Sequence, residues 1–176
     1  SYPGQLRLQA YSHIANGANM VEYWHWHSIH NAIESYWKGV LSHDLAPNRT
    51  YKECSVVGNE WKRIGSHLVN LKKKNRVAVI ASNEALTGLV EFPMQSKTAD
   101  GYNTVLRWLC DALYMMNIEY DIISSHSDNF SDYDYLFVPA LYSASENELK
   151  ALDEYALNGG NLLVTFKSGF SDEHLK

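Results

Sequence analysis

The pattern of apolar and polar positions predicts a regular α/β unit in the second part of the chain. Short apolar runs, typical of strands buried on both faces, are expected at 77–81, 118–123, 135–138 and 161–166. Amphipathic helices are expected between them, at 102–117 and 146–157. The alternation of strands and helices predicts right-handed crossovers and a parallel sheet, for which we expect the order 2-1-3-4 of flavodoxin-like folds.

Two local signals refine this α/β unit. Ser145 and Glu148 have the spacing of a capping box at the start of the second helix. Between the first strand and the first helix, over 82–101, the sequence predicts a loop. A further strand or helix could follow the fourth strand.

The first part of the chain has a different pattern, with one strand between helices. A helix is expected from Leu6 to Asn16 and a strand from Met20 to Trp26. A long helix is expected from Thr50, with Glu53 completing a capping box, and its apolar stripe runs as far as Leu71. A single strand cannot form a sheet, so this part requires partner strands from elsewhere.

The segment 20–45, MVEYWHWHSIHNAIESYWKGVLSHDL, has the highest density of chemically able side chains. It carries three of the five tryptophans and four of the eight histidines, together with the carboxylate of Glu34. Such groups just beyond the end of a strand are typical of ligand sites in α/β architectures. We therefore expect the functional residues of this chain in this segment.

Two kinds of site compete for this segment. His25 and His27 alternate on the expected strand, and His30 and Glu34 follow, which is a possible metal-binding set. No second cluster of ligands is evident, so we predict no metal and no cofactor. Glu34 and Trp37 instead suit a sugar, because a carboxylate accepts hydrogen bonds from hydroxyl groups and an indole face covers a pyranose. The alternative is a loop carboxylate beside a core tryptophan.

The second part offers weaker candidates. The loop Ser82–Leu86 has no glycine-rich cradle for phosphate. The corner Lys167–Gly169 comes nearest to a nucleophile elbow without matching its form. Asn59 and Glu60 could be mistaken for a catalytic pair, but the stripe pattern places them on the exposed side of a helix. We expect the second part to serve packing or assembly.

Composition excludes several classes of function. The chain has 176 residues and a net charge of −5, which argues against nucleic acid as a partner. No apolar run reaches the roughly 18 residues that a membrane helix requires. The two cysteines, Cys54 and Cys110, lack metal spacing and are expected to be buried in helices. A reducing compartment is the default, so we expect a cytoplasmic protein.

Several motifs together resemble the glycoside hydrolase family 42 β-galactosidases. The matching runs in the first part are Gly4–Leu8, His13–Ala18, Tyr23–His27 and Glu34–Leu41, and those in the second part are Pro139–Tyr142 and Gly159–Gly169. The resemblance implies that residues 1–75 are the C-terminal part of a (β/α)8 TIM barrel, with its eighth strand and flanking helices. It implies that residues 76–176 are a flavodoxin-like (class I amidotransferase-like) trimerisation domain, open to truncation at its C-terminal end.

The resemblance also implies an activity for the parent protein. Family members hydrolyse terminal β-D-galactosides by a retaining mechanism with two glutamates, which follow earlier strands of the barrel. No catalytic residue is therefore expected in this chain, and we expect the chain alone to be inactive. Glu34 matches a substrate-contacting glutamate of the family, and Trp37 stands where many members have histidine, which leaves the role at that position open. The alternatives are a non-catalytic α/β interaction domain and an amidotransferase-like hydrolase.

Overall fold

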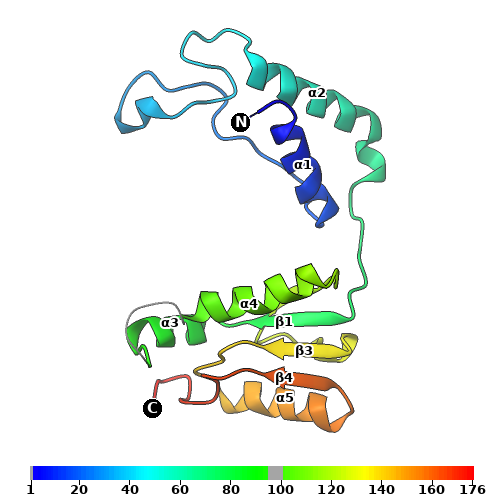
Figure 1. The fold of residues 1–176 in the computed structure, drawn as a ribbon, viewed down its shortest axis with the longest axis vertical. Coiled ribbons are helices and arrows are strands. Elements are labelled where there is room, and N and C mark those ends of the chain that lie inside the picture. Colours follow the sequence, from blue (N-terminus) through cyan, green and yellow to red (C-terminus); the bar gives the residue numbers. More distant parts are fainter. Residues whose placement is uncertain (1, 95–100) are drawn as a thin grey trace. The chain divides into compact units, whose positions relative to one another are not determined.

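The computed structural model describes residues 2–94 and 101–176, and the chain forms two compact units, Ser1–Lys73 and Lys74–Lys176 (Figure 1). The boundary between them falls inside the basic run Lys72–Lys74, at which the sequence pattern changes. Each unit has its own packing and is described by itself.

The second unit is built on a four-stranded parallel sheet in the order β2-β1-β3-β4, as predicted. The strands are β1 (Val77–Ala81), β2 (Asp121–Ser124), β3 (Tyr135–Val138) and β4 (Asn161–Val164). In the central register, Ala78 of β1 lies opposite Asp121 of β2 and Leu136 of β3. Tyr135 of β3 lies opposite Asn161 of β4, so β4 forms one edge of this sheet.

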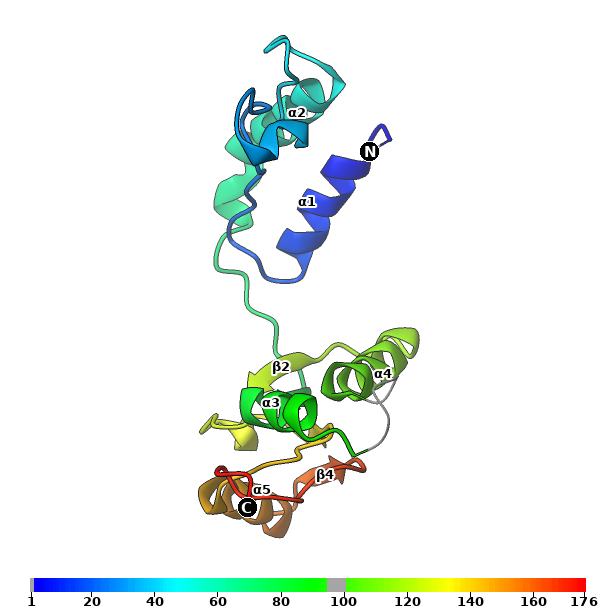
Figure 2. The same cartoon turned by 90° about the vertical axis from the view of Figure 1, so that its left-hand side faces the viewer.

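Helices cover both faces of the sheet, which explains why its central strand is apolar throughout. The helices are α3 (Asn83–Glu91), α4 (Tyr102–Met115) and α5 (Glu146–Leu157), with a short 3₁₀ helix, η3 (Phe130–Asp132). Val79 packs on the side of Leu113 of α4, whereas Ile80 belongs to the cluster that contains Leu152 of α5. Figures 1 and 2 show α4 and α5 on opposite sides of the sheet. Successive residues of β1 therefore meet different helices.

Helix α3 occupies much of the segment for which the sequence predicts a loop, so that prediction was wrong. Ser82 caps the helix, because its hydroxyl oxygen accepts a hydrogen bond of 3.1 Å from the Ala85 amide. The helix has a glycine at position 88 because a Cβ there would lie 2.8 Å from a ring atom of Tyr142. Glycine is unfavourable in a helix on propensity alone, and tertiary packing decides this position. Residues 95–100 of the predicted loop lie outside the described residues.

The second strand begins later than predicted because the preceding helix ends in a Schellman motif. Asn117 has φ 55°, and its amide donates to the Tyr114 carbonyl at 3.0 Å. The Ile118 amide donates to the Leu113 carbonyl at 2.9 Å. Ile118 thus belongs to the helix terminus and not to β2. The capping box of Ser145 and Glu148 at the start of α5 is confirmed.

The first unit contains two helices, α1 (Gln5–Ala15) and α2 (Arg49–Ile64), which pack on each other. Among its described residues there are also two 3₁₀ helices, η1 (Ile33–Tyr36) and η2 (Gly65–His67). Among the described residues of this unit no strand is formed, so the prediction of a strand at 20–26 was wrong for this structure. A strand requires a hydrogen-bonded neighbour along its length, whereas this segment has backbone hydrogen bonds at its last two residues, next to the isolated bridge between His27 and Leu41.

Helix α2 begins before the predicted cap and ends before the predicted terminus. Asn48, and not Thr50, is its N-cap, with a side-chain oxygen 3.0 Å from the Tyr51 amide. The helix ends at Ile64, where Gly65 starts the 3₁₀ turn, and does not continue to Leu71.

Glu60 has a structural role, contrary to the prediction that it is an ordinary surface residue. Its carboxylate accepts hydrogen bonds from Arg7 Nε at 2.9 Å and from the Tyr11 hydroxyl at 2.8 Å. It therefore ties α1 to α2. These bonds, that from Arg7 first, hold the pKa of the Glu60 carboxyl below its usual range.

Large apolar side chains of the first unit remain exposed. Trp24 is 80% exposed, Trp26 62% and Met20 71%. Large apolar side chains are seldom so exposed in a folded domain. No helix within residues 2–94 and 101–176 is long and apolar enough to cross a membrane.

Candidate functional site

The segment rich in tryptophan and histidine forms a loop that is closed at its base, and we call this base the neck. In the neck, residues 25–28 meet residues 39–41. The Val40 amide donates to the His25 carbonyl at 2.8 Å, and the Leu41 amide donates to the Trp26 carbonyl at 2.9 Å. The neck holds the ends of the loop together although residues 20–26 form no strand.

Ser28 and Gly39 make the neck compact. Ser28 is completely buried, and its hydroxyl oxygen accepts a hydrogen bond of 3.1 Å from the Gly39 amide. A Cβ on Gly39 would lie 2.4 Å from the backbone carbon of His27, so no larger residue fits without a shift of the backbone. The sequence carries no local sign of this contact, because it arises between residues that are distant along the chain.

Glu34 and Trp37 lie at the tip of the loop, on and just after η1. Ala32 precedes this short helix with φ 62°, a backbone conformation that a non-glycine residue rarely adopts. Within the described residues the Glu34 carboxylate makes no hydrogen bond or ion pair, and Trp37 is 50% exposed. The Trp37 ring lies 5.1 Å from that of Tyr36, at an interplanar angle of 31°. The tip thus presents one carboxylate and two neighbouring aromatic rings.

Two histidines of the loop hold backbone in place. His30 Nε2 lies 2.6 Å from the His43 carbonyl, and His43 Nε2 lies 2.7 Å from the Ser35 carbonyl. A carbonyl only accepts, so Nε2 carries the proton in both rings. Among the described residues, no group of three or more histidine, cysteine or acidic side chains could hold a metal ion. His25, His27, His30 and Glu34 are thus not brought together as a metal-binding set.

The carboxyl edge of the sheet in the second unit carries a small polar cluster. His126 follows β2 and lies between two carboxylates: its Nε2 is 3.4 Å from Glu84 Oε1, and its Nδ1 is 3.7 Å from Glu148 Oε1. Burial by itself raises the pKa of the Glu148 carboxyl, but hydrogen bonds, chiefly from the Ser145 amide, bring it below its usual value. Glu148 is 5% exposed, so it acts as a cap and not as an accessible acid.

In the corner Lys167–Gly169 the serine hydroxyl takes part in a contact between loops. The Ser168 hydroxyl oxygen accepts a hydrogen bond of 2.9 Å from the Leu141 amide. The loop after β3 is likewise held to the residue that follows β4, because the Ala140 amide donates to Thr165 Oγ1 at 2.9 Å. These contacts join two loops at the sheet edge and favour a structural role for Ser168.

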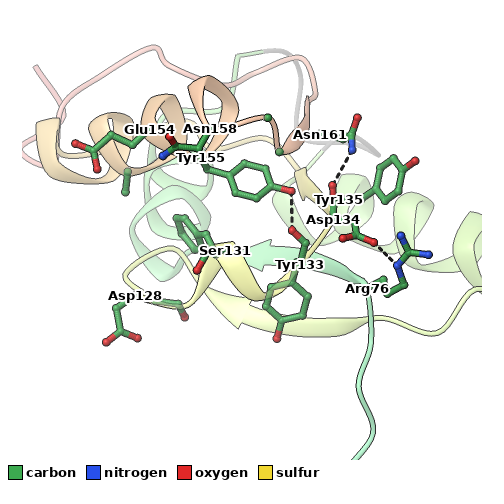
Figure 3. A pocket seen from close by; sticks show the side chains of 15 residues that line it. Arg76, Asp128, Ser131, Tyr133, Asp134, Tyr135, Glu154, Tyr155, Asn158 and Asn161 are labelled. Carbon is green, nitrogen blue, oxygen red and sulfur yellow. Dashed lines mark hydrogen bonds and ion pairs between the residues drawn. The ribbon is translucent and has the colours of Figure 1, made fainter.

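The opposite edge of the sheet contains a cavity of about 590 Å³, which we call the amino-edge cavity (Figure 3). It lies where β3 and β4 begin, between the segment 127–135 and the C-terminal part of α5. Nothing in the sequence pattern signalled it, since it is formed by residues from three separate segments.

Family comparisons agree with the two-unit organisation. A family model described as "Beta-galactosidase trimerisation domain" matches residues 75–176, and a model described as "Beta-galactosidase" matches residues 1–64. The first match covers more than half of the chain, and β-galactosidases of this family align with both segments in the same order. The chain therefore belongs to the glycoside hydrolase family 42 β-galactosidases.

Individual relatives extend over nearly the whole chain. The β-galactosidase BgaP of Planococcus sp. (strain L4) is 30% identical over 174 residues, which is 97% of this chain and 25% of the relative. The β-galactosidase GalA of Bacillus licheniformis is 31% identical over 175 residues, again 97% of this chain and 25% of the relative. The chain thus spans about a quarter of the length of these curated relatives.

A solved structure shows the same fold. The crystal structure of β-galactosidase from Bacillus circulans sp. alkalophilus is 28% identical and superposes with a TM-score of 0.91. The superposition covers 99% of this chain and 26% of the solved one. The four-stranded parallel α/β fold is therefore shared with β-galactosidases of this family.

Proposed function

We propose that this chain is part of a β-galactosidase that hydrolyses terminal β-D-galactosides by a retaining two-glutamate mechanism. In this proposal residues 1–75 are the last portion of a (β/α)8 barrel. The acid/base and nucleophile glutamates are supplied by other parts of the longer protein. The chain contributes contacts to the sugar and an assembly domain.

One observation carries this proposal. The two family models match the chain in consecutive segments, 1–64 and 75–176, and the boundary between the two compact units falls between these segments. The exposed tryptophans and the segment 20–26, which forms no strand in the first unit, suit a piece of barrel whose neighbouring strands would cover them.

We assign Glu34 and Trp37 to the galactose subsite. The support is physical: the Glu34 carboxylate has no partner among the described residues and can accept hydrogen bonds from sugar hydroxyls. The exposed Trp37 ring offers a flat apolar face to a pyranose. TIM-barrel sites are built from the loops that follow the strands, which is where the proposed eighth strand leads into this loop.

Substitution of Glu34 in the full-length enzyme tests this assignment. Glu34→Gln should weaken transition-state binding, as measured through kcat/KM, by roughly 2–4 kcal/mol. This is the scale of a lost hydrogen bond to a charged group. The melting temperature should stay nearly unchanged, because the side chain is not part of the core. Trp37→Ala should also lower activity, with Trp37→Phe retaining part of it.

Glu91→Gln, at the exposed end of α3, is the matched control and should leave both activity and melting temperature as they are. If Glu34→Gln keeps wild-type kinetics while the protein melts early, Glu34 is structural and the subsite assignment is wrong.

Residues 1–176 alone should not hydrolyse galactosides. A retaining mechanism requires a nucleophile and an acid/base about 5 Å apart, and the proposal places both outside this chain. A chromogenic galactoside assay of the purified chain measures this directly. Turnover within about tenfold of a full-length relative would contradict the proposal that the catalytic glutamates lie outside this chain.

We further propose that residues 76–176 are a flavodoxin-like domain that assembles the parent into a trimer in the cytoplasm. The strand order supports the first point, the description of the matching family supports the second, and two cysteines without a disulfide support the third. Light scattering on the full-length enzyme should give three times the chain mass. In isolation, the second unit is a non-catalytic interaction domain.

A further inference from the structure

The tip of the loop that carries Glu34 has little packing of its own to fix it. No side chain from Asn31 to Trp37 is buried among the described residues. Within η1 the Trp37 amide donates to the Glu34 carbonyl at 3.0 Å. The neck closes the loop at 25–28 and 39–41, away from η1 along the chain. The orientation of the Glu34 carboxylate therefore depends on the contacts that reach η1 itself.

The ring of His43 makes such a contact. His43 follows the second arm of the neck, and its Nε2–H donates to the Ser35 carbonyl at 2.7 Å. This distance is shorter than the ordinary value of about 2.9 Å for an N–H···O bond. Ser35 directly follows Glu34 in η1, so the bond holds the peptide next to the candidate site carboxylate. One side chain thus connects the returning arm of the loop to its tip.

The backbone around His43 is itself held on two sides. The His43 carbonyl accepts a hydrogen bond of 2.6 Å from His30 Nε2, and the two rings lie 5.5 Å apart. The preceding residue, Ser42, accepts a hydrogen bond of 2.8 Å from Asn48 Nδ2. Asn48 is the N-cap of α2, and its side-chain oxygen is fixed by that role. His43 therefore joins η1 to a segment that is anchored on α2.

We propose that His43 is a positioning residue for the galactose subsite, because it holds η1 and keeps the Glu34 carboxylate in one orientation. This inference rests on the assignment of Glu34 under the proposed function. The Nε2–H group is present both in this tautomer of the neutral ring and in the protonated ring, so the contact does not require a charge on His43. What the position requires is a hydrogen-bond donor at Nε2.

Substitutions in the full-length enzyme test this requirement. His43→Phe keeps a ring but removes the donor, and should lower kcat/KM about tenfold, the upper range for one hydrogen bond. His43→Gln places an amide N–H near the position of Nε2 and should stay within about threefold of the wild type. His13→Phe, at an exposed position of α1, is the matched control and should leave kcat/KM unchanged. Equal losses for His43→Phe and His43→Gln would overturn the proposal.

A double-mutant cycle shows whether His43 acts through Glu34. In a Glu34→Ala background the positioned group is gone, so His43→Phe should lower kcat/KM by less than about a further twofold. A further loss of about tenfold would overturn the proposal, because His43 would then act independently of Glu34.

Hydrogen exchange in residues 1–176 tests the hold on η1 without relying on activity. The Trp37 amide should exchange about tenfold faster in His43→Phe and at the wild-type rate in His43→Gln. The Val40 amide, which donates to the His25 carbonyl in the neck, should keep its rate in both variants. If Glu34→Ala keeps the wild-type kcat/KM, the subsite assignment itself is wrong. Unchanged Trp37 exchange in His43→Phe overturns the His43 proposal alone.

Discussion

The two units differ in where their elements find hydrogen-bonding and packing partners. In the second unit each strand lies beside another strand of the same chain, and helices bury both faces of β1. In the first unit, among the described residues, the buried apolar side chains are Ala10, Val40 and Val57. Its stability rests on one helix pair, the Glu60 bonds and the neck of the loop. The comparison teaches that apolar residues form strands only where neighbouring strands are available.

The largest expected effect is the loss of unfolding free energy when a core leucine of the second unit is shortened, because the first unit has few buried side chains. Leu136→Ala, at a completely buried position of β3, should reduce the free energy of unfolding by about 2–5 kcal/mol. Leu8→Ala, at a position of α1 that is 70% exposed, should change it by less than about 0.5 kcal/mol. Urea unfolding of residues 1–176 followed by circular dichroism gives both values. A similar loss in the two variants would remove the distinction.

Glycine substitutions within the first unit sharpen the comparison at an intermediate scale. Gly39→Ala places a Cβ against the His27 backbone and should destabilise the neck by about 1–3 kcal/mol. Gly58→Ala, in α2 with open space around the new Cβ, should stabilise by about 0.5–1 kcal/mol. Calorimetry of the full-length enzyme should show changes of opposite sign, and kcat/KM should fall only for Gly39→Ala.

If the Gly39→Ala variant has the melting temperature and the kcat/KM of the wild type, the neck does not restrain the loop tip. The subsite proposal would then lose one of its positioning elements, although Glu34 could still contact the sugar.

The smallest expected effect is the dependence of the second unit on acid. Hydrogen bonds hold the pKa of Glu148 below its usual value in the folded state. The ionised carboxylate therefore stabilises the fold at pH values above the unfolded pKa of about 4.3. This contribution is lost as the pH falls through the folded pKa. The stability difference between wild type and Glu148→Gln should thus be present at pH 7 and shrink below about pH 4.3.

Urea midpoints measured over this pH range check the sign. Glu146→Gln, two residues earlier in the same first turn and without the capping-box bonds, serves as control and should show a smaller difference at pH 7. A difference that grows on acidification would contradict the assignment of Glu148 as an ionised cap.

The sequence predicted the parts of the fold whose determinants are local. The strand order, β1, β3 and the Ser145 capping box followed from apolar runs and cap spacing. Helix α3 was missed because Thr87 and Gly88 weaken its helical pattern, and packing against Tyr142 compensates. The strand at 20–26 was wrong because strand formation depends on neighbours, and the sequence of the segment itself cannot show them.

The candidate site also has parts that the local sequence predicted and parts that it could not predict. Residue types pointed to Glu34 and Trp37, and the structure places both at one loop tip, although their role in binding remains a prediction. The contact of Ser28 with Gly39 and the amino-edge cavity could not be predicted, because each joins residues that are far apart along the chain. Spacing along a sequence indicates which side chains share a helix or strand face, but not which loops will meet.

The closed neck has an evolutionary consequence for the loop. Its restraints are backbone hydrogen bonds, one buried serine and one glycine, whereas the tip from Asn31 to Trp37 contributes no buried side chain. Substitutions at the tip can therefore change the groups that the loop presents at little cost to folding. Selection for a different ligand could act on the tip residues while the neck stays the same. Under the proposed subsite assignment, the loop is a place where new specificity can arise without a new scaffold.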